Sequence, residues 1–185
     1  MKKGKLFVVS GPSGVGKDTI VGEYLKNNNG MLSISATTRK PRDGEKDGKD
    51  YYFLTKEEFE DWIKKDDFLE YAAYNDNYYG TPKSKIFENL EKGIDVFLII
   101  EVNGAIQIKN KISESILIFV LPPSMEELEK RIKNRNLDSE EVINNRLKIA
   151  RDEIKLSSKY DYVVTNNKIE DTVKKLKMII DNEKN

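Results

Sequence analysis

Short apolar segments alternate with amphipathic segments along this chain. Five of the apolar segments are rich in apolar or β-branched residues and predict strands, at 6–10, 32–35, 95–101, 116–121 and 162–165. Their apolar residues form continuous runs rather than occupying every second position, which is typical of parallel strands buried on both faces. Segments with helical periodicity separate most of them. The order predicts a three-layer α/β fold, with helices on both faces of a parallel sheet.

Capping signals mark several helix starts. Thr55 and Ser124 each stand three residues before a glutamate, which is the spacing of a capping box. Thr81 and the proline after it offer a cap and a first helical residue, and Gly93 offers a stop. Further helices are expected at 19–26, at about 139–156 and near 171–180. Two stretches fit the pattern poorly and look like insertions: 36–77 is polar and turn-rich, and 131–151 is strongly charged.

A glycine-rich loop follows the first predicted strand directly and reads G-P-S-G-V-G-K. A loop of this kind between a strand and a helix is typical of phosphate binding, because its N–H groups and the positive helix end face phosphate oxygens. Glycines at both ends of the loop allow the backbone to turn and to approach a phosphate closely. The lysine can reach the outer phosphates of a nucleoside triphosphate. The loop therefore predicts triphosphate binding by Gly11, Pro12, Ser13, Gly14, Val15, Gly16 and Lys17.

The position after the loop lysine is unusual. A serine or threonine commonly stands there and contacts Mg²⁺ through its hydroxyl. Here Lys17 is followed by Asp18 and then Thr19. Asp18 can bind magnesium directly, act through a water, or cap the helix start, where a carboxylate is favoured. We expect Mg²⁺ to be held through the triphosphate, with either Asp18 or Thr19 as the protein ligand.

Composition narrows the chemistry. The chain has 185 residues, enough for one domain with small insertions. It contains no cysteine and no histidine, which excludes disulfides, zinc–thiolate sites, thiol nucleophiles and histidine bases. Phosphoryl transfer remains compatible with a chain that has no cysteine and no histidine, because the reaction relies on positioning and on charge neutralisation by Lys, Arg and Mg²⁺.

Charge and hydropathy bear on partners and location. Lys+Arg and Asp+Glu both total 32, so the net charge is zero, which argues against nucleic acid or a membrane surface as a partner. The longest apolar runs, 96–100 and 116–121, are too short to span a bilayer, and the first apolar run is too short for a signal peptide. We therefore expect a cytoplasmic protein.

The segment 35–42 carries two arginines, Arg39 and Arg42, on a proline-held stretch suited to bidentate contact with a phosphate. Tyr51 and Tyr79 can donate hydrogen bonds to the same phosphate.

Two further residues suit a guanine base. Glu70 can accept two parallel hydrogen bonds from adjacent N–H donors, which guanine offers at N1 and N2 and adenine does not. Thr81 can donate to a carbonyl oxygen such as guanine O6. A guanine nucleoside monophosphate fits these residues.

Over nearly its whole length the chain resembles guanylate kinase. The matching segments are 11–17, 35–42, 48–52, 68–70, 77–81, 121–128, 138–147 and 160–166. Together they are specific, whereas the phosphate loop alone would suit many kinases and GTPases. The resemblance implies phosphoryl transfer from ATP to GMP or dGMP in purine nucleotide metabolism. It also implies a P-loop core (1–34, 83–125 and 152–185), an inserted GMP-binding domain (35–82) and a mobile helical lid (126–151).

The resemblance also implies roles for individual residues. The GMP phosphate would be held by Ser35, Arg39, Arg42, Tyr51 and Tyr79, and guanine would be read by Glu70 and Thr81, with Gly80 allowing close approach. In the lid, Arg135 and Arg146 would close over the transferring phosphoryl group, with Arg131 a weaker candidate. Asn166, with Asn167 as a second candidate, would lie near the ATP adenine. The catalytic set is then Lys17, Arg39, Arg42, Arg135 and Arg146.

The chain departs from the family pattern in two places. Relatives usually carry two acidic residues, spaced by one, at the end of the strand at 95–101; here Ile99 fills the first position and Glu101 the second. Either Glu101 alone does what the two acidic residues of relatives do in the GMP site, or the first acidic residue is dispensable. Asn134 and Asn136 stand where relatives often have glycine, and asparagine tolerates left-handed backbone angles, so a turn can persist there.

Two other functions compete with this reading. A catalytically silent, guanylate-kinase-like binding module should have lost the ATP loop, which is intact here. A kinase for another phosphorylated small molecule should lack the base-reading pair, and Glu70 and Thr81 are both present. The sequence leaves the oligomeric state open, and a homodimer is compatible with it.

Overall fold

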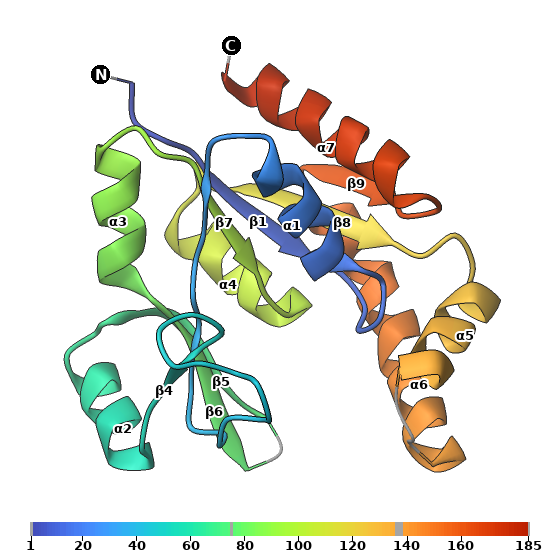
Figure 1. Ribbon diagram of the computed structural model, residues 1–185, viewed down its shortest axis with the longest axis horizontal. Helices are drawn as coiled ribbons and strands as arrows, with labels where there is room; N and C mark the ends of the chain where they lie inside the picture. The colour runs from blue at the N-terminus through green and yellow to red at the C-terminus, as the bar shows by residue number, and fades with distance from the viewer. Residues whose placement is uncertain (1, 75, 136–138, 185) are drawn as a thin grey trace.

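A computed structural model describes residues 2–74, 76–135 and 139–184. Its centre is a five-stranded sheet in the order β2-β7-β1-β8-β9 (Figure 1). The strands are β1 (Leu6–Ser10), β2 (Met31–Leu32), β7 (Val96–Ile99), β8 (Ile116–Leu121) and β9 (Tyr162–Thr165). All neighbouring strands pair in parallel, and every residue of β1 is buried. The prediction of a parallel sheet buried on both faces is confirmed.

Helices cover both faces of this sheet. On one face, α1 (Lys17–Lys26) packs beside α7 (Ile169–Lys184); on the other lie α3 (Lys83–Glu91) and α4 (Val102–Lys111). The alternating side chains of β1 divide between the two cores, which explains why the strand is apolar without interruption. The first core contains Phe7, Val9, Ile20, Val21, Leu176 and Ile180. The second contains Leu6, Val8, Ile86, Ala105 and Ile108.

A second, smaller sheet lies at the lower left of Figure 1. Its order is β4-β3-β6-β5, formed by β3 (Ala36–Thr37), β4 (Tyr52–Phe53), β5 (Phe68–Tyr74) and β6 (Asn77–Pro82). Helix α2 (Lys56–Lys64) packs on it. The sheet has a core of its own, made by Ala36, Phe59, Phe68, Trp62 and Tyr78, with Phe59 and Phe68 stacked at 4.4 Å between ring centroids. The stretch that fitted the main sheet poorly is therefore a structured unit.

The charged segment after β8 forms two helices, α5 (Met125–Arg135) and α6 (Glu140–Lys155), and a 3₁₀ turn, η1 (Leu156–Lys159), follows them. They pack together through Leu128, Ile132, Ile143, Leu147 and Ala150. In Figure 1 the pair lies at the lower right and the second sheet at the lower left, with the end of β1 between them. Within the described residues, no helix is long and apolar enough to cross a membrane.

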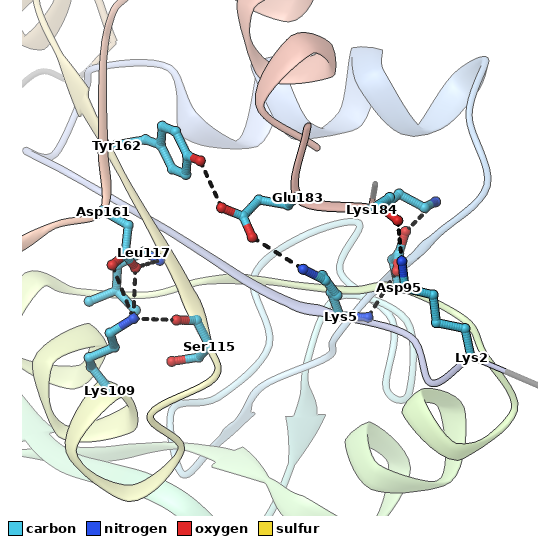
Figure 2. Close-up of polar contacts among 10 residues, drawn as sticks. All are labelled: Lys2, Lys5, Asp95, Lys109, Ser115, Leu117, Asp161, Tyr162, Glu183 and Lys184. Carbon is cyan, nitrogen blue, oxygen red and sulfur yellow. Dashed lines mark hydrogen bonds and ion pairs between the residues drawn. The ribbon is translucent and has the colours of Figure 1, made fainter. Parts of the chain in front are cut away.

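Polar contacts tie the amino ends of the strands to the end of α7 (Figure 2). Asp95 is buried, accepts a hydrogen bond from the Lys5 backbone N–H at 2.9 Å, and pairs with Lys184 at 2.7 Å. Glu183 accepts from Lys5 Nζ at 3.2 Å and from the Tyr162 hydroxyl at 2.7 Å. These contacts fasten the last helix at the end of the sheet opposite the phosphate loop.

Most of the local signals have the expected outcome. Thr55 caps α2 in a complete capping box with Glu58, and Ser124 accepts from the Glu127 N–H at 3.1 Å at the start of α5. Ser139 caps α6.

Three expectations about boundaries are wrong. Thr81 does not cap α3, which begins after Pro82; Thr81 lies inside β6, where its hydroxyl is bonded to a buried carboxylate. The strand expected at 95–101 ends at Ile99, because Glu101 has become the N-cap of α4, a helix that no cap signal predicted. The strand expected at 32–35 is only the two-residue β2.

Candidate functional site

The phosphate loop joins β1 to α1, and its backbone requires its glycines. Gly11, Gly14 and Gly16 have φ values of 143°, 84° and 98°. A Cβ on Gly11 would lie 2.3 Å from the carbonyl oxygen of Val120 in β8, so a side chain cannot fit between the loop and the sheet. The loop is thus pressed against the carboxyl ends of the central strands.

Lys17 lies at the centre of this loop. Its ammonium donates to the carbonyl oxygens of Gly11 at 2.6 Å and Pro12 at 3.1 Å, and the residue is only 8% exposed. The loop therefore encloses a cation beside the N-terminus of α1, an arrangement that attracts phosphate groups.

A pocket of about 450 Å³ opens next to the loop, between α1, α5 and the β9–α7 connection. It is lined by residues that include Gly14, Thr19, Arg131, Asn134, Asn166 and Asn167. Asn166 is buried, donates from Nδ2 to the Val15 carbonyl at 2.8 Å, and accepts from the Thr172 hydroxyl at 3.1 Å. Asn166 and Asn167 thus line the pocket beside the phosphate loop, and their place near an ATP adenine stays a prediction.

One arginine of the helical pair reaches the phosphate loop, and another lines the pocket beside it. Arg146 donates to the Ser13 hydroxyl at 3.3 Å. Arg131 donates to Glu127 at 3.1 Å and to the Asn166 carbonyl at 3.2 Å, so it braces the pocket wall. The side chain of Arg135 lies outside the described residues.

The expected turn at Asn134 is wrong, because Asn134 lies within helix α5. Asn136, the second asparagine of that expectation, lies outside the described residues.

A cluster of arginine and tyrosines gathers on the second sheet. The Arg39 guanidinium lies over the Tyr51 ring at 5.3 Å and over the Phe53 ring at 5.7 Å. Tyr51 and Tyr79 meet edge to face, with centroids 6.4 Å apart, and burial raises the pKa of Tyr51. The structure thus brings together three of the five residues expected to hold a phosphate.

The other two residues expected at the phosphate lie close by in the chain. Arg42 is exposed on the turn that follows Arg39. Ser35 is half-buried just before β3, and its carbonyl accepts from the Tyr52 N–H at 2.9 Å.

Glu45 joins this cluster and was not expected from the sequence. Its two carboxylate oxygens accept from the two terminal nitrogens of Arg39, each at 2.9 Å, and one of them also accepts from the Arg42 N–H at 2.7 Å. These hydrogen bonds lower the pKa of Glu45 to about 2. A carboxylate six residues after an arginine in a loop follows no regular period, although opposite charges at this separation are a weak signal.

Glu70 and Thr81 face each other across β5 and β6. Glu70 is 7% exposed, and the Thr81 hydroxyl donates to its Oε1 at 2.6 Å. Burial raises the Glu70 pKa, and the hydrogen bond from Thr81 opposes the rise. Since a hydroxyl has one proton, Thr81 cannot also donate to guanine O6 while it holds Glu70. Its observed action is to orient the carboxylate.

Gly80 lies in the same strand, but its surroundings point to packing. A Cβ there would lie 2.8 Å from the Phe68 ring and 3.0 Å from the Phe59 ring. The small core therefore needs a glycine at this position.

A third group of side chains lies near the end of β7. Glu101 is exposed at the start of α4, and Ile99 packs against the main core, which accounts for an apolar residue there. Glu153 on α6 is half-buried; burial and the charge of Glu101 raise its pKa to about 7, and Lys17 opposes the rise. Glu153 was missed by the sequence reasoning, yet it stands two helical turns after Arg146 and so on the same face of α6.

The start of α1 carries two oxygen-bearing side chains that can be tested for their fit to a magnesium ion. Thr19 lines the pocket with the loop glycines, and the exposed Asp18 is close enough to affect the pKa of Tyr51. A hydroxyl and a carboxylate are hard oxygen donors of the kind Mg²⁺ prefers. Both residues fit a magnesium ion that arrives with nucleotide phosphates.

Comparisons with known proteins agree with this arrangement. The chain is 56% identical to a guanylate kinase from Clostridium tetani over 184 residues, covering all of this chain and 88% of that protein. It is 54% identical to a guanylate kinase from Clostridioides difficile over 186 residues, covering all of this chain and 91% of that protein. The crystal structure of guanylate kinase from Anaplasma phagocytophilum superposes with a TM-score of 0.80 at 36% identity, covering 98% of this chain and 87% of that chain.

The family assignment rests on the whole length of the chain. The sequence model named Guanylate kinase matches residues 3–183, which include the phosphate loop, the second sheet and the helical pair. The loop geometry and the buried glutamate on the second sheet lie within that match. The chain belongs to the guanylate kinase family.

Proposed function

We propose that this chain transfers the γ-phosphoryl group of ATP to GMP, and to dGMP, giving ADP and the nucleoside diphosphate. The observation that carries the proposal is the buried Glu70 carboxylate, held by Thr81 on the second sheet. Guanine can donate both N1–H and N2–H to such a carboxylate, whereas adenine has no matching pair. The phosphate loop on the main sheet supplies the other half of a two-substrate site.

ATP would bind along the main sheet as its Mg²⁺ complex. Its phosphates would lie in the loop 11–17 against the backbone N–H groups and Lys17, with its base in the pocket beside Asn166. Thr19 or Asp18 would hold the Mg²⁺ that arrives with ATP, and this ion would supply charge neutralisation at the phosphates.

GMP would bind on the second sheet. Arg39, Arg42, Tyr51, Tyr79 and Ser35 would hold its phosphate while Glu70 reads the base. This places one oxygen of the GMP phosphate toward the γ-phosphorus of ATP.

The reaction is then an in-line displacement with no covalent enzyme intermediate. The GMP phosphate oxygen forms the new bond to the γ-phosphorus, and the bond from this phosphorus to the bridging oxygen of ADP breaks. Lys17 would hold the ATP phosphates and Arg39 the GMP phosphate, so that the reacting atoms lie in line. Arg146, which already donates to Ser13, would stabilise the transferring group together with Arg135. We propose that 35–82 moves as a GMP-binding domain and 126–151 as a lid that expels water.

The test is ADP release by the purified protein with ATP and Mg²⁺ and, in parallel reactions, GMP, AMP, CMP or UMP. We expect rapid turnover with GMP alone, and loss of turnover in a Lys17→Ala control. Equal turnover with AMP, or full activity in the control, would overturn the proposal. Binding of GMP without turnover would instead favour the silent binding module, which the intact loop and Lys17 do not favour.

A cytoplasmic location and a place in purine nucleotide metabolism belong to the same proposal. Both follow from the substrates, because ATP and GMP are nucleotides of the cell interior. Fractionation of cells expressing the tagged chain would test the location, and recovery with membranes would contradict it.

A further inference from the structure

We infer that Glu45 is a positioning residue for the phosphoryl acceptor: it fixes the Arg39 guanidinium in the orientation that receives the GMP phosphate. This rests on the proposed function. The first observation is a bidentate ion pair, in which the two terminal nitrogens of Arg39 each donate to one oxygen of Glu45 at 2.9 Å. The two side chains are partly buried, at 16% and 21% exposed.

The contacts of Arg39 determine which of its donors stay available. Of five N–H groups, two donate to Glu45 and one, on the nitrogen shared with that pair, donates to the Lys40 carbonyl at 2.7 Å. The guanidinium plane is supported from below by the Tyr51 and Phe53 rings. The Nε–H and one terminal N–H donate to neither Glu45 nor Lys40, and Tyr79 also interacts with the guanidinium. The phosphate would bind at these two donors, beside the Tyr79 hydroxyl.

Glu45 is itself held in place by the turn from Arg42. Its backbone N–H donates to the Arg42 carbonyl at 3.0 Å, and Gly44 provides the left-handed residue of the turn with φ of 88°. The carboxylate also accepts from the Arg42 N–H at 2.7 Å. One side chain therefore connects the guanidinium of Arg39 to the backbone that carries Arg42. The two arginines expected at the GMP phosphate are thus held in register by Glu45.

Orientation and charge predict opposite effects, which makes the inference testable. A carboxylate near a phosphate repels it, so if Glu45 were only a counter-ion, its neutralisation would tighten GMP binding. If Glu45 orients Arg39, its neutralisation releases the guanidinium and weakens GMP binding. The low pKa of Glu45 keeps it ionised at every pH at which the enzyme would be assayed, so both effects are present throughout.

The experiment compares Glu45→Gln, Glu45→Asp and the control Glu57→Gln, an exposed glutamate on α2, with the wild type. We expect the KM for GMP to rise about 10-fold or more in Glu45→Gln, the range for losing a hydrogen bond to a charged partner, while the KM for ATP changes less than about twofold. Glu45→Asp keeps the charge but is one methylene too short for the fork, so it should be impaired to a similar degree. The control should match the wild type.

Calorimetric titration with GMP and with guanosine completes the test. GMP affinity should fall in Glu45→Gln, and guanosine affinity should stay unchanged, since guanosine has no phosphate for Arg39. Tighter GMP binding in Glu45→Gln, or wild-type kinetics in Glu45→Asp, would overturn the inference. A wild-type protein that does not phosphorylate GMP would overturn the proposed function instead, so the two failures can be told apart.

Discussion

Replacing Glu153 by glutamine should stabilise the folded protein at neutral and alkaline pH and have little effect in acid. Burial and the charge of Glu101 raise the Glu153 pKa from its ordinary 4.5 to about 7. Between these values the folded state binds more protons than the unfolded chain, so this group makes the free energy of unfolding fall as pH rises from about 4.5 to about 7. Above that range the folded protein carries the full cost of a half-buried carboxylate.

The size of the effect follows from the same shift. A pKa rise from 4.5 to about 7 corresponds to at most about 3.4 kcal/mol, at about 1.36 kcal/mol for each pH unit. Because the side chain is only half-buried, solvent screens part of this, and we expect about 1–2 kcal/mol. Glutamine has nearly the same shape and is neutral at every pH. The variant should therefore gain about 1–2 kcal/mol at pH 8 and close to nothing at pH 4.5.

The assay is urea unfolding followed by far-ultraviolet circular dichroism, repeated from pH 4.5 to pH 8.5. The matched control is Glu114→Gln, an exposed glutamate in the loop before β8, which should show no comparable gain. A gain for Glu153→Gln that is the same at every pH would mean that packing, not ionisation, causes it. A loss of stability at pH 8 would refute the reasoning, because the Glu153 carboxylate would then be a net stabilising partner of Lys17.

Four further predictions concern other parts of the molecule. Gly11→Ala should lower the melting temperature by several degrees, because its Cβ would lie 2.3 Å from the Val120 carbonyl oxygen; an unchanged melting temperature would contradict this. Glu70→Gln should lower kcat/KM for GMP roughly 100-fold and leave the KM for ATP unchanged. In the wild type, GMP binding should weaken as pH falls through the raised Glu70 pKa, which pH-dependent titration would detect. Asp95→Asn should lower the free energy of unfolding by about 1–3 kcal/mol in urea titrations, since Lys184 would lose its partner.

Features of the fold that depend on neighbours in the sequence could be predicted. The apolar run of β1 and the capping box of Thr55 are both local, and both predictions are confirmed. Thr81 shows where local reasoning fails. It has the residue type and the proline neighbour of a helix cap, but Glu70, on the adjacent strand, takes its hydroxyl. A tertiary hydrogen bond to a buried carboxylate outweighs a cap, because leaving that carboxylate without a partner is more costly.

The candidate site likewise contains residues that the sequence could predict and residues that it could not. The loop lysine and the Arg39 segment carry motifs, so their residue types and spacing were enough to predict them. Glu45 and Glu153 carry no motif, and each matters only through what lies near it in space. Glu153 gains its raised pKa from burial and from the charge of Glu101, and nothing in the sequence around it indicates either. Such residues become visible only once the chain is folded.

The two proposed phosphate sites are held in place in different ways, one by backbone packing and one by side-chain contacts, and this determines how each should respond to substitution. The loop is fixed by backbone, through the close contact of Gly11 with β8, so changes there act on folding first. The cluster on the second sheet is fixed by side chains, through the Arg39–Glu45 pair on a surface turn. Ion pairs near the surface contribute little to stability. Variants of Glu45 should therefore keep the wild-type free energy of unfolding while losing affinity for GMP, and a Glu45→Gln protein as unstable as Gly11→Ala would show that this division is wrong.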